Sequence, residues 1–175
     1  ELDEKVSNIL RLIFRTSMNP HKPFGSLASP EHGQAGRKIG EEGIVLLQNK
    51  DNVLPIDLKK ARKIAVIGEN AIKMMTVGGG SSSLKVKYEI SPLDGLKNRV
   101  GSQTEVLYAR GYVGDPTGEY NGVQTGQDLK DDRSEDELLA EAVEVSKDAD
   151  YVIFFGGLNK SNHQDCEDSD RASLG

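Results

Sequence analysis

Three short runs of apolar, strand-forming residues, separated by helix-like segments, constrain the fold of this chain more than any other feature. The runs are residues 63–68, 105–109 and 149–155. Strands that alternate with helices form parallel sheets with right-handed crossovers. The sequence therefore predicts an α/β domain, a parallel-sheet three-layer sandwich. About three of its strands are present, and we expect more to follow Gly175.

Helix start and stop signals support this alternation. Ser91 can cap a helix whose first turn holds Pro92, and Gly101 can end that helix. Ser134 and Glu137 have the spacing of a capping box at the start of the next helix. One helix is thus expected in each of the two connections.

The residues before the first predicted strand form a separate region. Residues 2–14 place their apolar side chains at helical spacing, which predicts an amphipathic helix that packs on a partner surface. Residues 16–30 are rich in Pro, Gly and Ser and read as a linker. A second helix is predicted over residues 31–49, so we place a domain boundary at the linker.

Composition excludes several classes of function. The formal net charge is -6 and there is no basic stripe, which argues against nucleic-acid binding. The only cysteine, Cys166, rules out an intrachain disulfide and a multi-cysteine metal site. No segment is long and apolar enough to span a membrane, and no signal peptide is visible. Both ends of the chain look cut.

An acidic segment after the third strand offers the most specific chemistry. Glu167 is flanked by Asp165, Asp168 and Asp170, and like charges raise the pKa of a carboxyl group. A carboxylic acid that stays protonated near neutral pH is what a glycosidase uses to protonate a leaving oxygen. The alternative from these residues alone is a solvated acidic loop.

Two other kinds of site fit less well. The glycine-rich segment 78–83 begins too far after the first strand for a dinucleotide fingerprint, and no phosphate-loop lysine follows. It is either a flexible connection or a loop that reaches a neighbouring pocket. A metal site at His163 and its acidic neighbours is disfavoured, and Cys166 among acids should keep a high thiol pKa.

Taken together, the segments resemble glycoside hydrolase family 3, the β-glucosidase and β-xylosidase family. The resemblance covers nearly the whole chain, and its motifs occur in the family's order. They are residues 6–14, 42–49, 54–55, 63–71, 78–82, 91–96, 149–153 and 157–159, then Glu167 with Asp170 and Arg171.

The resemblance implies a TIM-type barrel followed by an α/β sandwich, with the active site between them. Residues 1–15 would be the terminal helix of the barrel, 16–30 the interdomain linker, and 31–175 the N-terminal part of the sandwich. The nucleophile would be an aspartate on the upstream barrel. Residues 1–175 alone are therefore expected to be inactive.

The same resemblance implies site residues. Glu167 falls on the acid/base of the family's Glu-Gly-x-Asp-Arg motif, although Asp168 stands where the family has Gly. Asp170 and Arg171 would support this loop. Substrate contacts would come from four residues of the glycine-rich loop, Gly79, Gly80, Ser81 and Ser82.

The implied activity is that of a retaining, exo-acting β-glucosidase acting on an oligosaccharide or glycoside, without metal or cofactor. A periplasmic or secreted location is favoured by the resemblance. The main competing hypothesis is a non-catalytic carbohydrate-binding or interdomain module. A nucleotide-binding domain is a third, less favoured hypothesis. The scarcity of aromatic residues, 5% with no Trp, disfavours a sugar-binding module.

Overall fold

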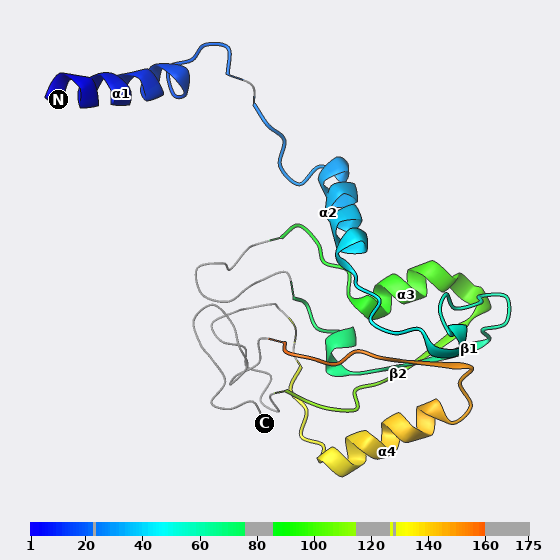
Figure 1. The fold of residues 1–175 in the computed structure, drawn as a ribbon. Coiled ribbons are helices and arrows are strands. Elements are labelled where there is room, and N and C mark those ends of the chain that lie inside the picture. The colour runs from blue at the N-terminus through cyan, green and yellow to red at the C-terminus, as the bar shows by residue number, and fades with distance from the viewer. Residues whose placement is uncertain (23, 76–85, 115–126, 128, 160–175) are drawn as a thin grey trace. The chain divides into compact units, whose positions relative to one another are not determined.

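The computed structural model describes residues 1–22, 24–75, 86–114, 127 and 129–159 (Figure 1). The chain divides into two compact units, Glu1–Leu47 and Gln48–Gly175. None of the helices in these described ranges is long and apolar enough to cross a bilayer.

The first unit contains two helices, α1 (Leu2–Arg15) and α2 (Pro30–Gly43). The amphipathic helix predicted at the N-terminus is confirmed, and its apolar side chains are exposed. Helix α2 begins at a Ser29 cap, whose hydroxyl accepts a hydrogen bond from the His32 backbone N–H. The prediction that this helix continues to residue 49 is wrong, because Ile44 is extended. Two β-branched residues after Gly43 favour that conformation.

The second unit contains a three-stranded parallel sheet. Its strands are β1 (Lys63–Ile67), β2 (Glu105–Ala109) and β3 (Tyr151–Phe154), in the order β2-β1-β3. Ile64 of β1 is paired with Val106 on one side and with Tyr151 on the other. The predicted parallel sheet is confirmed. Short 3-10 helices lie at Lys50–Asn52 (η1), Glu69–Ala71 (η2) and Gly101–Gln103 (η4).

Two helices cover opposite faces of this sheet (Figure 1). Helix α3 (Pro92–Val100) connects β1 to β2, and helix α4 (Glu135–Ser146) connects β2 to β3. The Ser91 cap of α3 and the capping box of α4 form as the sequence predicts. The result is the three-layer α/β arrangement expected from the alternation of elements.

Side-chain alternation along β1 produces a separate core on each face. Ile64 and Val66 pack with Leu93 and Val100 of α3. Ile67 packs instead with Ala142 of α4. A central strand that is covered on both faces reads as a continuous apolar run, which is why β1 could be recognised in the sequence.

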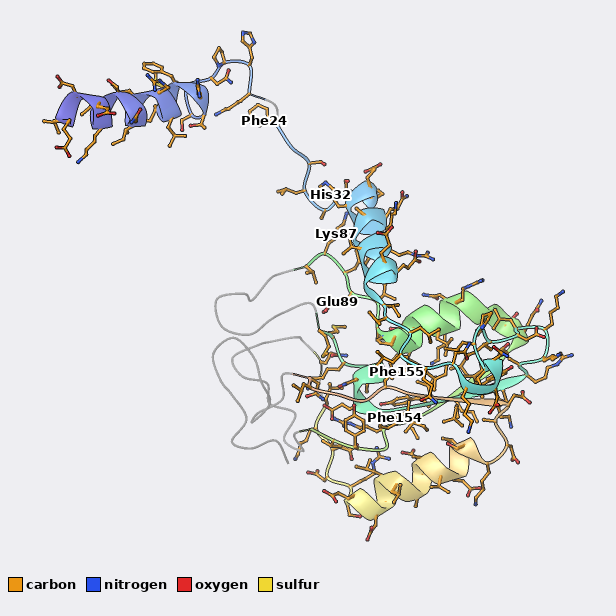
Figure 2. All side chains as sticks on the ribbon, viewed as in Figure 1. Phe24, His32, Lys87, Glu89, Phe154 and Phe155 are labelled. Atoms are coloured by element: carbon orange, nitrogen blue, oxygen red, sulfur yellow. The ribbon has the colours of Figure 1, made fainter. Side chains whose placement is uncertain are left out.

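The strand order reverses between β1 and β3. The chain leaves β1 for β2 on one side and then returns past β1 to form β3 on the other. In open α/β sheets, ligands bind outside the carboxyl ends of the strands at such a switch point. In Figure 2, Phe154 and Phe155 mark this end of β3 and lie toward opposite faces of the sheet.

Candidate functional site

The candidate site is built from the residues that directly follow the three strands. Glu69 and Asn70 come after β1, Arg110 comes after β2, and Asn159 lies just beyond β3. Because all three strands are parallel, their carboxyl ends meet at one edge of the sheet. Polar residues that are distant in the sequence therefore come together here.

Glu69 is the centre of this polar cluster. Its side chain is 1% exposed, and its carboxylate accepts four hydrogen bonds. Oε1 accepts from Lys73 Nζ at 3.2 Å and from Asn159 Nδ2 at 3.0 Å. Oε2 accepts from Arg110 Nη2 at 3.1 Å and from the Gly114 backbone N–H at 2.9 Å. Both oxygens are thus saturated, as a buried carboxylate requires.

Arg110 extends the cluster to the segment that precedes α4. Its Nη2 donates to the Leu129 carbonyl at 2.6 Å, and its Nη1 lies 3.1 Å from Asp131 Oδ2. Asp131 also accepts two hydrogen bonds from the guanidinium of Arg133. These bonds hold the pKa of the Asp131 carboxyl well below its usual range. The cluster is therefore a network of charges that balance one another.

Gly68 allows the backbone segments that follow β1 and β3 to approach each other closely. Its φ is +125°, and a Cβ at this position would lie 2.2 Å from the Phe155 carbonyl oxygen. Next to it, the Asn70 side-chain amide donates to the Gly157 carbonyl at 3.0 Å. The hydrogen-bonded ladder of the two strands thus continues into the site as backbone and side-chain contacts.

Two tyrosines hold the backbone of this edge. The Tyr108 hydroxyl donates to the Gly68 carbonyl at 3.3 Å, and the Tyr112 hydroxyl donates to the Phe155 carbonyl at 2.8 Å. Burial raises the pKa of Tyr108 to about 12 and also raises the pKa of Tyr112. Both hydroxyls therefore act as hydrogen-bond donors at neutral pH.

A pocket of about 410 Å³ opens beside the cluster, at the switch point between β1 and β3. Its lining is mostly apolar and includes Met74, Pro92, Phe155 and Leu158. Polar groups come from Asn70, Lys73, Glu89 and Ser91. Binding pockets typically combine an apolar wall with a few polar groups in this way.

Two buried side-chain atoms in the described part of the chain have no hydrogen-bond partner. They are Oδ1 of Asn70 and Nε of Arg110, and both belong to this region. Unsatisfied buried groups are uncommon in folded proteins. Their concentration here distinguishes the carboxyl edge from the rest of the sheet. Among the described ranges, no three His, Cys, Asp or Glu side chains are grouped closely enough to hold a metal ion.

Every site residue predicted from the sequence lies outside the described residues. This applies to Glu167, to its neighbours Asp170 and Arg171, and to the four loop residues Gly79, Gly80, Ser81 and Ser82. Glu69, Lys73, Arg110 and Asn159 were not predicted as site residues from the sequence. One signal was available, since charged or amide residues follow each predicted strand within a few positions.

Comparison with known proteins decides the family. The model of the glycosyl hydrolase family 3 C-terminal domain matches residues 44–175. The chain belongs to glycoside hydrolase family 3. The resemblance in the sequence motifs is thereby confirmed. The polar cluster and the pocket lie within residues 44–175, the part of the chain that the family model matches.

Family 3 relatives match along nearly the whole chain. The β-glucosidase BoGH3A of Bacteroides ovatus is 44% identical over 98% of this chain and 23% of its own length. A β-xylosidase of Formosa agariphila is 30% identical over 99% of this chain and 23% of its own. The chain thus spans about a quarter of these relatives.

A solved structure gives the same result for the fold. The crystal structure of a family 3 β-glucosidase from Bifidobacterium adolescentis is 30% identical in sequence and superposes with a TM-score of 0.67. The superposition covers 94% of this chain and 21% of that one. The α/β fold predicted from the alternation of elements is therefore shared with a family 3 enzyme.

Proposed function

We propose that this chain is part of a retaining, exo-acting β-glucosidase that hydrolyses terminal, non-reducing β-linked sugars. The observation that carries the proposal is the 44% identity to a β-glucosidase over 98% of the chain. The more distant match to a β-xylosidase supports the wider class of β-glycosidases. A periplasmic or secreted location is proposed from the family resemblance alone.

In the proposed mechanism, Glu167 is the acid/base, and an aspartate of an upstream barrel is the nucleophile. The aspartate attacks the anomeric carbon while Glu167 gives its proton to the departing oxygen. Glu167 then takes a proton from the water that releases the sugar. Such carboxyl pairs lie about 5 to 5.5 Å apart. The ionised aspartate would raise the pKa of Glu167 until the glycosyl-enzyme forms.

The carboxyl edge of the sheet would support this chemistry by holding the residues that precede the proposed site segments. The loop with Gly79, Gly80, Ser81 and Ser82 begins shortly after Lys73, and the segment with Glu167, Asp170 and Arg171 begins after Asn159. We assign the first loop to substrate contact and the Asp170–Arg171 pair to loop support. The apolar pocket at the switch point is the proposed place for the group attached to the sugar.

Glu167→Gln in the complete enzyme tests the acid/base assignment. We expect kcat to fall by roughly 10²–10⁴-fold on glycosides with poor leaving groups, the range for general acid catalysis. Good leaving groups should suffer much less, and azide should restore part of the lost rate. Glu105→Gln, an exposed change on β2, is the matched control and should behave like the wild type.

Two results would reject parts of the proposal. Wild-type rates of Glu167→Gln on all of these substrates would show that another group is the acid/base. An initial product of inverted configuration, observed by proton NMR, would exclude the retaining mechanism.

A further inference from the structure

We propose that Glu69 is a positioning residue for catalysis, which fixes three stems at the carboxyl edge of the sheet. The stems are the described residues Lys73, Gly114 and Asn159, which precede residues 76–85, 115–126 and 160–175. One of these stems leads to Glu167, so the inference rests on the proposed function. In this role Glu69 touches neither the sugar nor the nucleophile. It acts by holding the start of the acid/base segment in place.

The four donors to the Glu69 carboxylate come from four different positions along the chain. Lys73 precedes residues 76–85, Gly114 precedes residues 115–126, and Asn159 precedes residues 160–175. Arg110 directly follows β2 and also binds the Leu129 carbonyl, where the chain returns toward α4. One carboxylate therefore joins the stems of three segments at a single point.

Asn159 is the residue that ties the start of the acid/base segment to Glu69 by a hydrogen bond. Its side chain is held at both ends, since Nδ2 donates to Glu69 at 3.0 Å and Oδ1 accepts from Lys73 Nζ at 3.2 Å. The residue is 3% exposed and stands eight residues before Glu167. We therefore expect release of Asn159 to displace Glu167.

The arrangement requires a full carboxylate at position 69. Every group that faces it donates, and two of these groups, Lys73 and Arg110, carry positive charge. A glutamine would offer one acceptor oxygen and would turn an NH₂ group toward further donors. Asp131 supplies the second negative charge of the cluster, so its two buried cations are balanced.

The hydrogen bond between Asn159 and Glu69 lies beyond the strand pairing and outside the two apolar cores. The strand pairing of β1 with β3 ends at Ile67 and Phe154, before Glu69 and Asn159 are reached. The two apolar cores contain neither residue. Loss of the Asn159 tie should therefore leave the sheet intact and affect the segments beyond it.

Asn159→Ala in the complete enzyme is the test, because it releases the acid/base segment and keeps all charges of the cluster. The matched control is Thr104→Val, which removes the buried hydrogen bond from Thr104 to the Ala61 carbonyl at the opposite edge of the sheet. Both variants and Glu167→Gln are assayed on β-glucosides whose leaving groups range from dinitrophenol to simple alcohols.

We expect Asn159→Ala to lower kcat on the poorest leaving groups by about a hundredfold, the scale for displacement of a catalytic group by about 1 Å. The loss should shrink as the leaving group improves, which is the dependence that we also expect for Glu167→Gln. Thr104→Val should keep the wild-type dependence on leaving group.

Two results separate the two proposals. If Glu167→Gln shows the dependence and Asn159→Ala loses activity equally on all substrates, Asn159 and Glu69 are only structural, and this inference fails alone. If Glu167→Gln keeps wild-type rates on every substrate, the acid/base assignment fails, and the inference fails with it.

Discussion

The side-chain amide of Asn159 donates a hydrogen bond of 3.0 Å to the carboxylate of Glu69, although ninety residues separate them. The bond joins the chain just beyond β3 to the chain just beyond β1, past the point where the strand pairing ends. The carboxyl edge of the sheet is therefore tied together by buried side chains as well as by backbone.

The charge of Glu69 should be essential for stability. Glu69→Gln leaves the buried Lys73 and Arg110 without their shared negative partner. Removing one member of a buried ion pair typically costs about 3–5 kcal/mol, and we expect a loss of this size in the free energy of unfolding. Urea unfolding followed by circular dichroism measures it. The same change at the exposed Glu105 should cost less than about 1 kcal/mol, and equal costs at both positions would contradict the prediction.

Gly68 should not tolerate any side chain. Gly68→Ala would place a Cβ 2.2 Å from the Phe155 carbonyl oxygen and would put alanine at a φ of +125°. Backbone strain alone costs on the order of 1–3 kcal/mol, and the clash adds to it. Gly95→Ala in α3 is the control, because its Cβ would meet only an ordinary contact at 3.8 Å. Thermal unfolding should show a clear loss for the first variant and a gain of up to about 1 kcal/mol for the second.

Alkaline pH should destabilise the protein through Tyr108. Burial raises the pKa of its hydroxyl from 10.0 to about 12 in the folded state, so the unfolded chain loses this proton at a lower pH. The contribution of Tyr108 to stability is therefore complete below about pH 10 and is lost as the pH rises toward about 12.

Urea unfolding at several pH values tests this linkage. Tyr108→Phe should be less stable than the wild type at neutral pH, because it lacks the hydrogen bond to the Gly68 carbonyl. Its stability should decline less steeply above pH 10. Parallel pH profiles for the two proteins would show that Tyr108 does not carry the effect.

The pocket at the switch point should affect the choice of leaving group, if the proposed function holds. Leu158→Trp would place a large ring in this pocket, which has a volume of about 410 Å³. We expect kcat/KM to fall roughly tenfold or more for β-glucosides with bulky aryl groups, since steric changes in apolar pockets discriminate on this scale. Leu139→Trp makes the same change on α4 and should leave kcat/KM unaltered. Equal values for Leu158→Trp and the wild type would exclude the pocket from substrate binding.

Local signals in the sequence were sufficient for most of the secondary structure. The two ends of α3 are marked by Ser91 with Pro92 and by Gly101, and the start of α4 is marked by Ser134 with Glu137. These signals can be read locally because capping depends on residues only a few positions apart. The end of α2 does not follow from the apolar pattern, since apolar side chains at helical spacing continue past Gly43 while the backbone becomes extended at Ile44.

The apolar runs and the alternation of elements specify the fold class, because burial and hydrogen bonding leave few other ways to cover a strand such as β1. The family could likewise be recognised from the order of short motifs along the chain. The cluster around Glu69 could not be predicted from the sequence, because its members are far apart in the chain and each of them is an ordinary charged or polar residue when taken alone. Only the tertiary structure makes them a site, because the parallel sheet places the carboxyl ends of β1, β2 and β3 at one edge. Burial there requires that the polar side chains form hydrogen bonds with one another, as Glu69, Lys73, Arg110 and Asn159 do.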